Sequence, residues 1–278
     1  MHRFPTPTPP RLVVEFRAGS VLIETADVDE TTVDLRDRNG DDSSEAVAAT
    51  VIEQRGRDIV VRVPDRLRVL SRTPQLDLRV VAPHSTALDV QSGSATITAR
   101  GTFGTTAVST GSGDVTLETI DDSARVRTGS GRVGIGTVSG DLEVRSGSGG
   151  VEIDSVGGSV NAQSGAGDLR LRRGGAALHV KTGSGDVFVG DAPVDLRAVT
   201  GSGDVRIEAA ARGDVNVRVA SGDLHVGVPS GTSAWLDVHT LSGRLSSELQ
   251  SAAAPEGDED RVRLRLQTAS GDIELVRV

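Results

Sequence analysis

The sequence predicts an all-β protein built as a single-chain β-solenoid, with 18 residues per coil arranged as two nonapeptide strand–turn units. A hexapeptide recurs every 18 residues, a weaker turn motif recurs nine residues out of phase, and apolar residues lie two apart after each turn. The hexapeptide reads TGSGDV at 110–115, TGSGRV at 128–133, SGSGGV at 146–151, SGAGDL at 164–169, and TGSGDV at 182–187 and 200–205, with a degenerate copy, SGSATI, at 92–97.

The apolar residues that follow each turn predict the interior of the coils. The half-repeat turns read SGDL at 139–142, GGSV at 157–160, GAAL at 175–178 and PVDL at 193–196. A period of two is typical of a strand, so alternate apolar residues would point inward. The predicted inward pairs are Val115/Leu117, Val133/Ile135, Val151/Ile153, Leu169/Leu171, Val187/Val189 and Val205/Ile207 after the hexapeptides, and Leu142/Val144, Val160/Ala162, Leu178/Val180 and Leu196/Ala198 after the half-repeats.

Equivalent strands of successive coils would stack on one another. At a strand spacing of about 4.8 Å, residues 92–225 would form about seven coils and a rod about 35 Å long. Glycine would supply the positive φ angles needed at the corners. Between residues 208 and 213 the repeat gains one residue, which predicts a bulge or a widened corner.

The regions outside the repeat are also β-patterned. We expect a flexible Pro/Thr-rich segment at 1–10, a β-cap or small β-sandwich at 11–86, solenoid repeats at 87–228 and C-terminal capping strands at 229–278. In the last region we expect an acidic loop at 251–260, a closing hairpin at the C-terminus, and Trp235 as a lid over the last coil rather than a ligand platform. The expected strands are Leu12–Phe16, Ser20–Thr25, Thr31–Leu35, Val47–Glu53, Asp58–Val63 and Leu76–Val81 in the N-terminal region, and Ser233–Val238, Arg261–Leu266 and Gly271–Val278 in the C-terminal region.

The composition excludes several classes of function. A net charge of −9 disfavours non-specific binding to nucleic acid or anionic lipid, and the absence of cysteine excludes disulfides and thiolate metal sites. With no Tyr, one Trp and four Phe, the chain has few rings for stacking bases or sugars, or for protein-interface hot spots. No apolar stretch is long enough for a signal peptide or a membrane span, so we expect a cytoplasmic protein, with a surface or secreted location left open.

Three segments carry a resemblance to a known family: the SGSGDV-type repeats, GTSAWLDV at 231–238 and the terminal ASGDIELVRV strand. Together they resemble the bacterial "putative adhesin" family, a domain-of-unknown-function family of β-strand-repeat proteins. The opening Phe4-Pro5-Thr6-Pro7, followed by a Leu-Val-Val-Glu strand, is similar to actinobacterial members. The resemblance covers nearly the whole chain and implies a β-solenoid of uncertain biochemical role, with no catalytic residues to carry over.

Aspartates at the hexapeptide corner are the most regular polar feature of the sequence. They would stack one coil apart, and stacked carboxylates can bind cations. Calcium-binding β-rolls also use 18-residue coils, but their Gly-x-Asp spacing is absent here. We therefore expect these carboxylates to accept backbone N–H bonds in tight turns. The corner column contains Asp114, Asp168, Asp186, Asp204 and Asp223, with Arg132 and Gly150 in place of Asp, while the half-turn varies as Asp141, Ser159, Ala177 and Asp195.

Hydroxyl and imidazole groups do not form a catalytic arrangement in the predicted coils. The corner hydroxyls would stack on one another, and serine is inert without an activating base. His179 lies on a half-repeat strand and His225 on a full-repeat strand, so they would face different sheets, and neither has a second histidine at metal-ligand spacing. We therefore predict no catalytic, cofactor-binding or metal-binding residues. The stacked hydroxyls belong to Thr110, Thr128, Ser146, Thr182 and Thr200.

One outward column is mildly basic. It could meet an acidic polymer or partner, although Glu143 and Asp141 beside it favour a mixed, solvated face. The tripeptide Arg212-Gly213-Asp214 spells a cell-attachment motif, but the many Gly-Asp turns make coincidence the better interpretation. The basic column contains Arg127, Arg145, Gln163 and Lys181, with Arg125 two residues before its first member.

These observations favour a non-enzymatic, adhesin-like β-solenoid scaffold that mediates protein–protein interaction or self-association. The alternative is a calcium-binding β-roll or a polysaccharide-binding or polysaccharide-processing β-helix, although the aromatic subsites usual in carbohydrate-active β-helices are missing. We expect no cofactor, no nucleic-acid partner and no small-molecule ligand. End-to-end polymerisation is disfavoured, because the expected caps would block the terminal coils.

Overall fold

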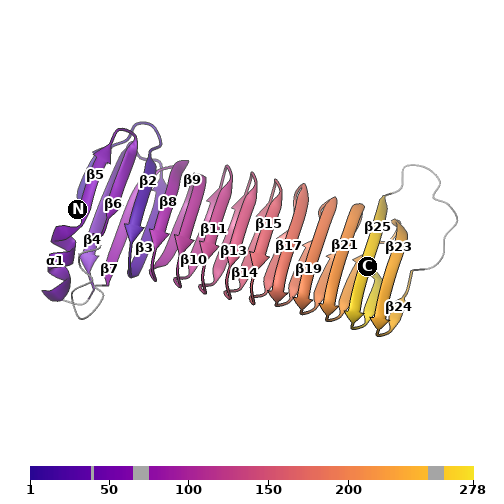
Figure 1. Ribbon diagram of the computed structural model, residues 1–278. Coiled ribbons are helices and arrows are strands. Elements are labelled where there is room, and N and C mark those ends of the chain that lie inside the picture. Colours follow the sequence, from indigo (N-terminus) through magenta and orange to yellow (C-terminus); the bar gives the residue numbers. More distant parts are fainter. Residues whose placement is uncertain (39–40, 65–74, 250–259) are drawn as a thin grey trace. The chain divides into compact units, whose positions relative to one another are not determined.

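The computed structural model describes residues 1–38, 41–64, 75–249 and 260–278 (Figure 1). The chain divides into two compact units, residues 1–140 and residues 141–278, which are described separately below. In each unit strands stack in parallel, coil upon coil and mostly in register, and α1 (Asp41–Ala49) is the one helix among the described residues. This confirms the predicted all-β solenoid class.

The coils of unit 1 are built from two parallel ladders. β9 passes through a corner and contributes one half to each ladder. The coil that comes first in the sequence, β2 with β3, therefore lies second in space, between β6/β7 and β8/β9. One ladder runs β6 (Asp58–Arg62), β2 (Arg11–Phe16), β8 (Thr86–Ser92), the second half of β9 (Thr96–Thr110) and β11 (Ala124–Thr128); the other runs β7 (Leu76–Pro83), β3 (Gly19–Ala26), the first half of β9, β10 (Val115–Ile120) and β12 (Val133–Val138).

Antiparallel strands close the outer coil of unit 1. β5 (Val51–Arg55) pairs with β6, β4 (Glu30–Asp37) pairs with β7, and β1 (His2–Pro5) pairs with β4. β1 lies within residues 1–10, so part of that expected flexible segment belongs to the sheet. The helix α1 (Asp41–Ala49) contacts β4.

The expected strand Val47–Glu53 is wrong in its first half. Residues up to Ala49 are helical and the strand starts only at Val51. The segment EAVAA at 45–49 is rich in alanine, the residue with the highest intrinsic helix propensity, and this local preference outweighs its apolar alternation. The other expected strands of this region are present as β2, β3, β4, β6 and β7.

Unit 2 also consists of two parallel ladders, called ladder A and ladder B below. Ladder A runs β13 (Leu142–Ser146), β15 (Val160–Ser164), β17 (Ala177–Ser184), β19 (Asp195–Ser202), β21 (Gly213–Ser221), β25 (Arg261–Ser270) and β23 (Ser233–Ser242). Ladder B runs β14 (Val151–Val156), β16 (Leu169–Arg173), β18 (Val187–Asp191), β20 (Val205–Ala209), β22 (Leu224–Val228), β26 (Ile273–Arg277) and β24 (Leu245–Ser247).

The expected C-terminal hairpin is wrong. β25 pairs in parallel with both β21 and β23, and β26 pairs in parallel with both β22 and β24 (Figure 1). The last residues of the sequence therefore form a further coil, which lies between the coil of β21 and β22 and the coil of β23 and β24. The reason is that Ser270-Gly271-Asp272 repeats the solenoid corner, while Leu264 continues the interior column instead of facing a hairpin partner.

Apolar columns fill the interior of both units, as the sequence predicts. Every predicted inward pair is buried. In unit 2 the columns advance by 18 residues, from Leu178 to Leu196, and then by 19, from Leu196 to Val215. The pairing of β19 with β21 shows no shift within the strands, so the extra residue lies in the corner before Gly213, whose φ is +87°. The sequence predicts either a bulge or a widened corner at this point, and the structure shows the widened corner.

The acidic loop expected at 251–260 lies outside the described residues except for Asp260. Within the described ranges, no helix is long and apolar enough to cross a membrane.

Candidate functional site

The corner aspartates form a hydrogen-bonded ladder between coils. Each carboxylate accepts the backbone N–H of the corresponding residue in the next coil, at 2.7–2.9 Å, rather than an N–H of its own turn. These hydrogen bonds explain why Asp recurs at the corner, and no bound cation is needed to account for it. The donor–acceptor pairs are Arg132 to Asp114, Asp186 to Asp168, Asp204 to Asp186, Asp223 to Asp204, Asp272 to Asp223 and Arg244 to Asp272, with Ser159 to Asp141 at the half-turn.

The same series of hydrogen bonds between aspartates and backbone N–H groups shows the order of the C-terminal coils. It passes from Asp223 to Asp272 and then to Arg244, so the coil at 242–244 follows the coil at 270–272 in space. Arg244 has no carboxylate to offer to a further coil. The outermost described coil thus carries the motif Ser-Gly-Arg, whereas the four coils that precede it in space carry Ser-Gly-Asp, at 184–186, 202–204, 221–223 and 270–272.

Glycine precedes each ladder aspartate because the coils approach closely at this corner. A Cβ placed on Gly203 would lie 2.3 Å from the carbonyl oxygen of Gly185, and one on Gly222 would lie 2.2 Å from that of Gly203. Both glycines also have a positive φ, at +133° and +148°. The corner motif is therefore fixed by backbone contact and hydrogen bonding within the fold.

The stacked hydroxyls are buried in the same corner, and all except Thr182, whose Oγ1 has no hydrogen-bond partner among the described residues, form hydrogen bonds within the turn. Thr110 accepts the N–H of Gly113 at 3.1 Å, and Thr128 accepts that of Gly131 at 3.0 Å. Ser146 instead donates to the carbonyl of Gly149 at 2.7 Å. The hydrogen bonds given for Thr110, Thr128 and Ser146 in the described ranges run to backbone groups of the turn and not to a side chain that could act as a general base. The other two predicted members, Thr182 and Thr200, are buried as well, and Thr200 donates to the carbonyl of Ser202.

The histidines considered from the sequence lie apart. His179 is exposed on ladder A, and His225 lies on ladder B, where its Nδ1 is 2.9 Å from a carboxylate oxygen of Glu274. Across the described parts of the chain, no group of three His, Asp or Glu side chains could hold a metal ion.

Both charged residues of the Arg-Gly-Asp tripeptide form ion pairs within the chain. Arg212 lies 3.6 Å from Asp260, and Asp214 lies 3.4 Å from Arg263. Its glycine forms the widened corner described above. These contacts account for the three residues within the fold.

The outward side of ladder A carries a row of cations. Arg145, Gln163 and Lys181 are register neighbours, as the predicted column requires, and Arg145 pairs with Glu143 at 3.0 Å. Arg127 and Arg125, the other members of the predicted column, lie on β11 in unit 1, so the row is described here for unit 2 alone. Four exposed cations on adjacent strands make no ion pair within the described ranges and are called the basic strip below. Lys181 and Arg218 lie in this column, and Arg197 and Arg265 lie in a second column two residues away along the strands.

Sequence reasoning stopped this column at Lys181 and missed the rest of the basic strip. The signal was present, because Arg218 follows Lys181 in the same column once the 18-residue step is replaced by the 19-residue step. Arg265 could not be placed from the sequence, since its coil is out of chain order. Asp195 and Asp214 precede the strip residues on two of these strands, so the strip has an acidic margin.

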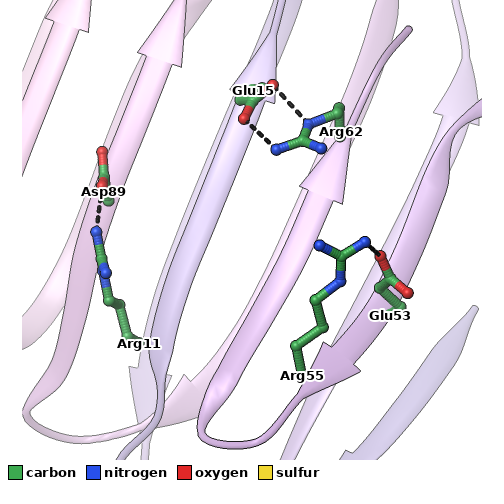
Figure 2. A network of polar contacts seen from close by, with 6 residues as sticks. All are labelled: Arg11, Glu15, Glu53, Arg55, Arg62 and Asp89. Atoms are coloured by element: carbon green, nitrogen blue, oxygen red, sulfur yellow. Dashed lines mark hydrogen bonds and ion pairs between the residues drawn. The ribbon is translucent and has the colours of Figure 1, made fainter.

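Exposed ion pairs of unit 1 lie between neighbouring strands and, in one case, within a strand (Figure 2). The pair between Arg62 and Glu15 is bidentate, with N···O distances of 2.7 and 2.6 Å. The hydrogen bond from Arg62, helped by its charge, lowers the pKa of Glu15 against the opposing effect of burial. Such half-exposed pairs contribute little stability, and they fasten strands rather than form a site. The pairs drawn are Arg62–Glu15 (β6 to β2), Arg11–Asp89 (β2 to β8) and Arg55–Glu53 (within β5).

Trp235 lies on β23 at the outermost described coil of unit 2. Its side chain is 53% exposed, and the guanidinium of Arg263 lies over its ring at 5.6 Å from the centroid. Its register partner in β25 is Arg263, whereas the interior column on β23 contains Leu236 and Val238. Trp235 therefore lies on the outward side of the coil, and the prediction of a lid over the last coil is wrong.

The solved structures similar to this chain include three of low identity. A "putative lipid binding protein" from Parabacteroides distasonis has 10% identity and a TM-score of 0.44. A "putative adhesin" from Bacteroides fragilis has 11% identity and a TM-score of 0.36, and a "putative adhesin" from the same Parabacteroides species has 13% and 0.35. Each alignment covers 100% of this chain and 95% of the other. No curated protein matches the chain.

The family model described as Toastrack DUF4097 matches residues 13–189 and 174–276, which together span nearly the whole sequence. This agrees with the coarse resemblance to a domain-of-unknown-function family, while the actinobacterial origin stays a prediction. The chain is a member of the Toastrack DUF4097 family.

Proposed function

We propose that this protein is a non-catalytic β-solenoid scaffold that binds an acidic partner protein through the outward side of ladder A. The observation that carries the proposal is the basic strip: four exposed cations on four adjacent strands, β17, β19, β21 and β25, with no ion pair within the described ranges. Adjacent strands lie about 4.8 Å apart, so the strip spans about 14 Å along the stack.

The other polar residues considered above support a binding role rather than catalysis. The corner aspartates accept backbone N–H groups, the corner hydroxyls lie in the turns, and His225 pairs with Glu274. A chain with a net charge of −9 has no general attraction for polyanions, so a local row of cations gives selectivity for a partner of matching shape.

The test is site-specific photo-crosslinking in the native cell, with the full chain. A crosslinking amino acid at position 199, between Lys181 and Arg218 in register, should give a discrete adduct that the variant K181E/R197E/R218E/R265E abolishes. The matched control, R170E/R172E/R173E/R206E, makes the same charge change on ladder B and should leave the adduct intact. An adduct that survives the strip variant, or the absence of any adduct, would overturn the proposal.

A further inference from the structure

The outermost described coil of unit 2 ends in open strand edges. β23 pairs with β25 and β24 pairs with β26, and the described ranges contain no strand on the other side of either. Unpaired N–H and C=O groups along a strand form a template for another strand.

Apolar side chains gather on this coil. Trp235, Leu236, Leu241 and Leu245 are between 38% and 87% exposed. The register partner of Leu236 is Leu264 and that of Leu245 is Ile273, and both partners are fully buried. The interior columns of unit 2 therefore continue up to an uncovered surface, which is uncommon for a monomeric protein.

The other unit shows how this chain covers such an edge. In unit 1 the outer coil of β6 and β7 is covered by antiparallel strands, β5 on β6 and β4 on β7. Ile59 and Val61 on β6 are fully buried as a result. An antiparallel strand with apolar alternation is thus a fitting occupant for the edge of β23.

β23 is complementary to itself in that arrangement. If two copies pair antiparallel about a two-fold axis at Val238, Asp237 lies opposite the partner's His239, and Trp235 lies opposite the partner's Leu241. Centring the axis on Asp237 would instead place two carboxylates opposite each other. A two-fold axis normal to the strands also sets β24 against β24 of the second copy, because both ladders end at this coil.

We propose that two copies of this chain dimerise head to head through β23 and β24, with Val238 at the two-fold axis. The dimer deepens the proposed scaffold function, since it would double the number of basic strips in one assembly. Self-association does not need the basic strip, so each proposal can fail alone. Because a coil end is small, we expect dissociation in the micromolar range, with monomer at about 1 μM and dimer at about 100 μM.

Sedimentation velocity over that concentration range, on the full chain, tests the dimer. The variant L241K should stay monomeric at every concentration, because it sets a charge on an exposed position of the edge. V194K, at another exposed apolar position in a corner away from β23, should dimerise like the wild type. A wild type that is monomeric throughout, or an L241K variant that still dimerises, would overturn the proposal.

Disulfide trapping tests the register. The chain has no cysteine, so V238C introduces a single thiol that would meet its own copy at the axis. Directly opposite residues of antiparallel strands have Cα atoms about 4.5–5.5 Å apart, within reach of a disulfide. V238C should form a covalent dimer under mild oxidation and T240C, two residues off the axis, should not. Equal crosslinking of both, or of neither, would contradict the proposed axis.

Discussion

The N-terminal end of unit 1 and the C-terminal end of unit 2 are built by the same device and finished differently. In both, the coil at the chain terminus lies second in space: β2/β3 beneath β6/β7, and β25/β26 beneath β23/β24. At the N-terminal end antiparallel strands cover the outer coil, whereas the described residues contain no such cover for β23 and β24.

This comparison shows that the end of a solenoid has two separate structural requirements. Placing the terminal coil second protects it from fraying, because strands pair with it on both sides. Covering the outermost coil is a separate task, and it requires antiparallel strands that the repeat does not supply. Ile59 at the covered end is fully buried, whereas Leu236 at the other end is 38% exposed.

The largest expected effect compares core truncations at the two ends. Ile59→Ala should destabilise the protein by about 3 kcal/mol, because it leaves a cavity in a sealed interior, while Leu236→Ala should cost about 1 kcal/mol. Leu264→Ala is the matched control, since it occupies the same column one coil further in. Urea unfolding followed by far-UV circular dichroism measures all three. Equal losses for Leu236→Ala and Leu264→Ala would show that the C-terminal coil is covered.

A smaller effect concerns the aspartate ladder. Asp223→Ala removes the acceptor of the Asp272 N–H, 2.7 Å away, and should cost about 1 kcal/mol, whereas Asp223→Asn keeps an oxygen in place and should cost less than half of that. Asp272→Ala affects only the outermost described coil and should cost less than Asp223→Ala.

Thermal melts of these ladder variants, with Asp195→Ala as a control that loses no hydrogen bond, provide the measurement. If Asp223→Ala and Asp195→Ala melt together, the ladder contributes no stability. A rise in melting temperature with added Ca²⁺, abolished by Asp223→Ala, would instead revive the calcium-binding alternative.

The smallest effect is an acid sensitivity of the N-terminal end. Burial raises the pKa of Asp77, but hydrogen bonds from Ser20 and Arg38 and the charge of Arg38 outweigh it, so the net shift is downward, as it is for Glu15 beside Arg62. Since the folded state holds these pKa values below the reference values of 3.8 and 4.5, their stabilisation is present above those pH values and is lost as the pH falls further.

The double variant Glu15→Gln/Asp77→Asn measures that contribution. At pH 7 the free energy of unfolding of the wild type should exceed that of the variant by up to about 1 kcal/mol, a small difference because both carboxylates are partly exposed. The difference should disappear between about pH 4.5 and pH 3. Urea unfolding of both proteins at pH 7 and at about pH 3 gives the comparison. A gap that widens in acid would contradict the assigned ion pairs.

The repeat and its interior were predictable from the sequence, while the ends were not. The 18-residue spacing fixes the register from Leu142 to Leu196, since a slip would turn every apolar side chain to solvent. The order of the last coils follows from pairing between segments far apart in the chain, which periodicity does not reveal. The motif Ser-Gly-Arg at 242–244 gives no clue either, because Ser-Gly-Arg at 130–132 and Ser-Gly-Gly at 148–150 also lack the aspartate and are followed by further strands.

The candidate surfaces were predicted in part, for the same reason. The column from Arg145 to Lys181 follows from the spacing, and the structural use of the corner aspartates agrees with their expected role as acceptors of backbone N–H groups. The donor in the next coil was missed, because tight-turn chemistry considers only the residue's own turn. The apolar surface around Leu241 depends on which coil is outermost and therefore could not be read from the sequence.

Hydrogen exchange along β6 and β23 tests the difference between the two ends most directly. It is measured residue by residue by mass spectrometry with electron-transfer fragmentation at about 1 μM, where the protein is expected to be monomeric. β6 pairs on both sides, so the amides from Ile59 to Val61 should all be protected. β23 pairs on one side only, so protection should alternate between successive residues from Leu236 to His239, and the exchanging amides should become protected at high concentration as the dimer forms. Uniform protection along β23 in the dilute sample would contradict the open edge.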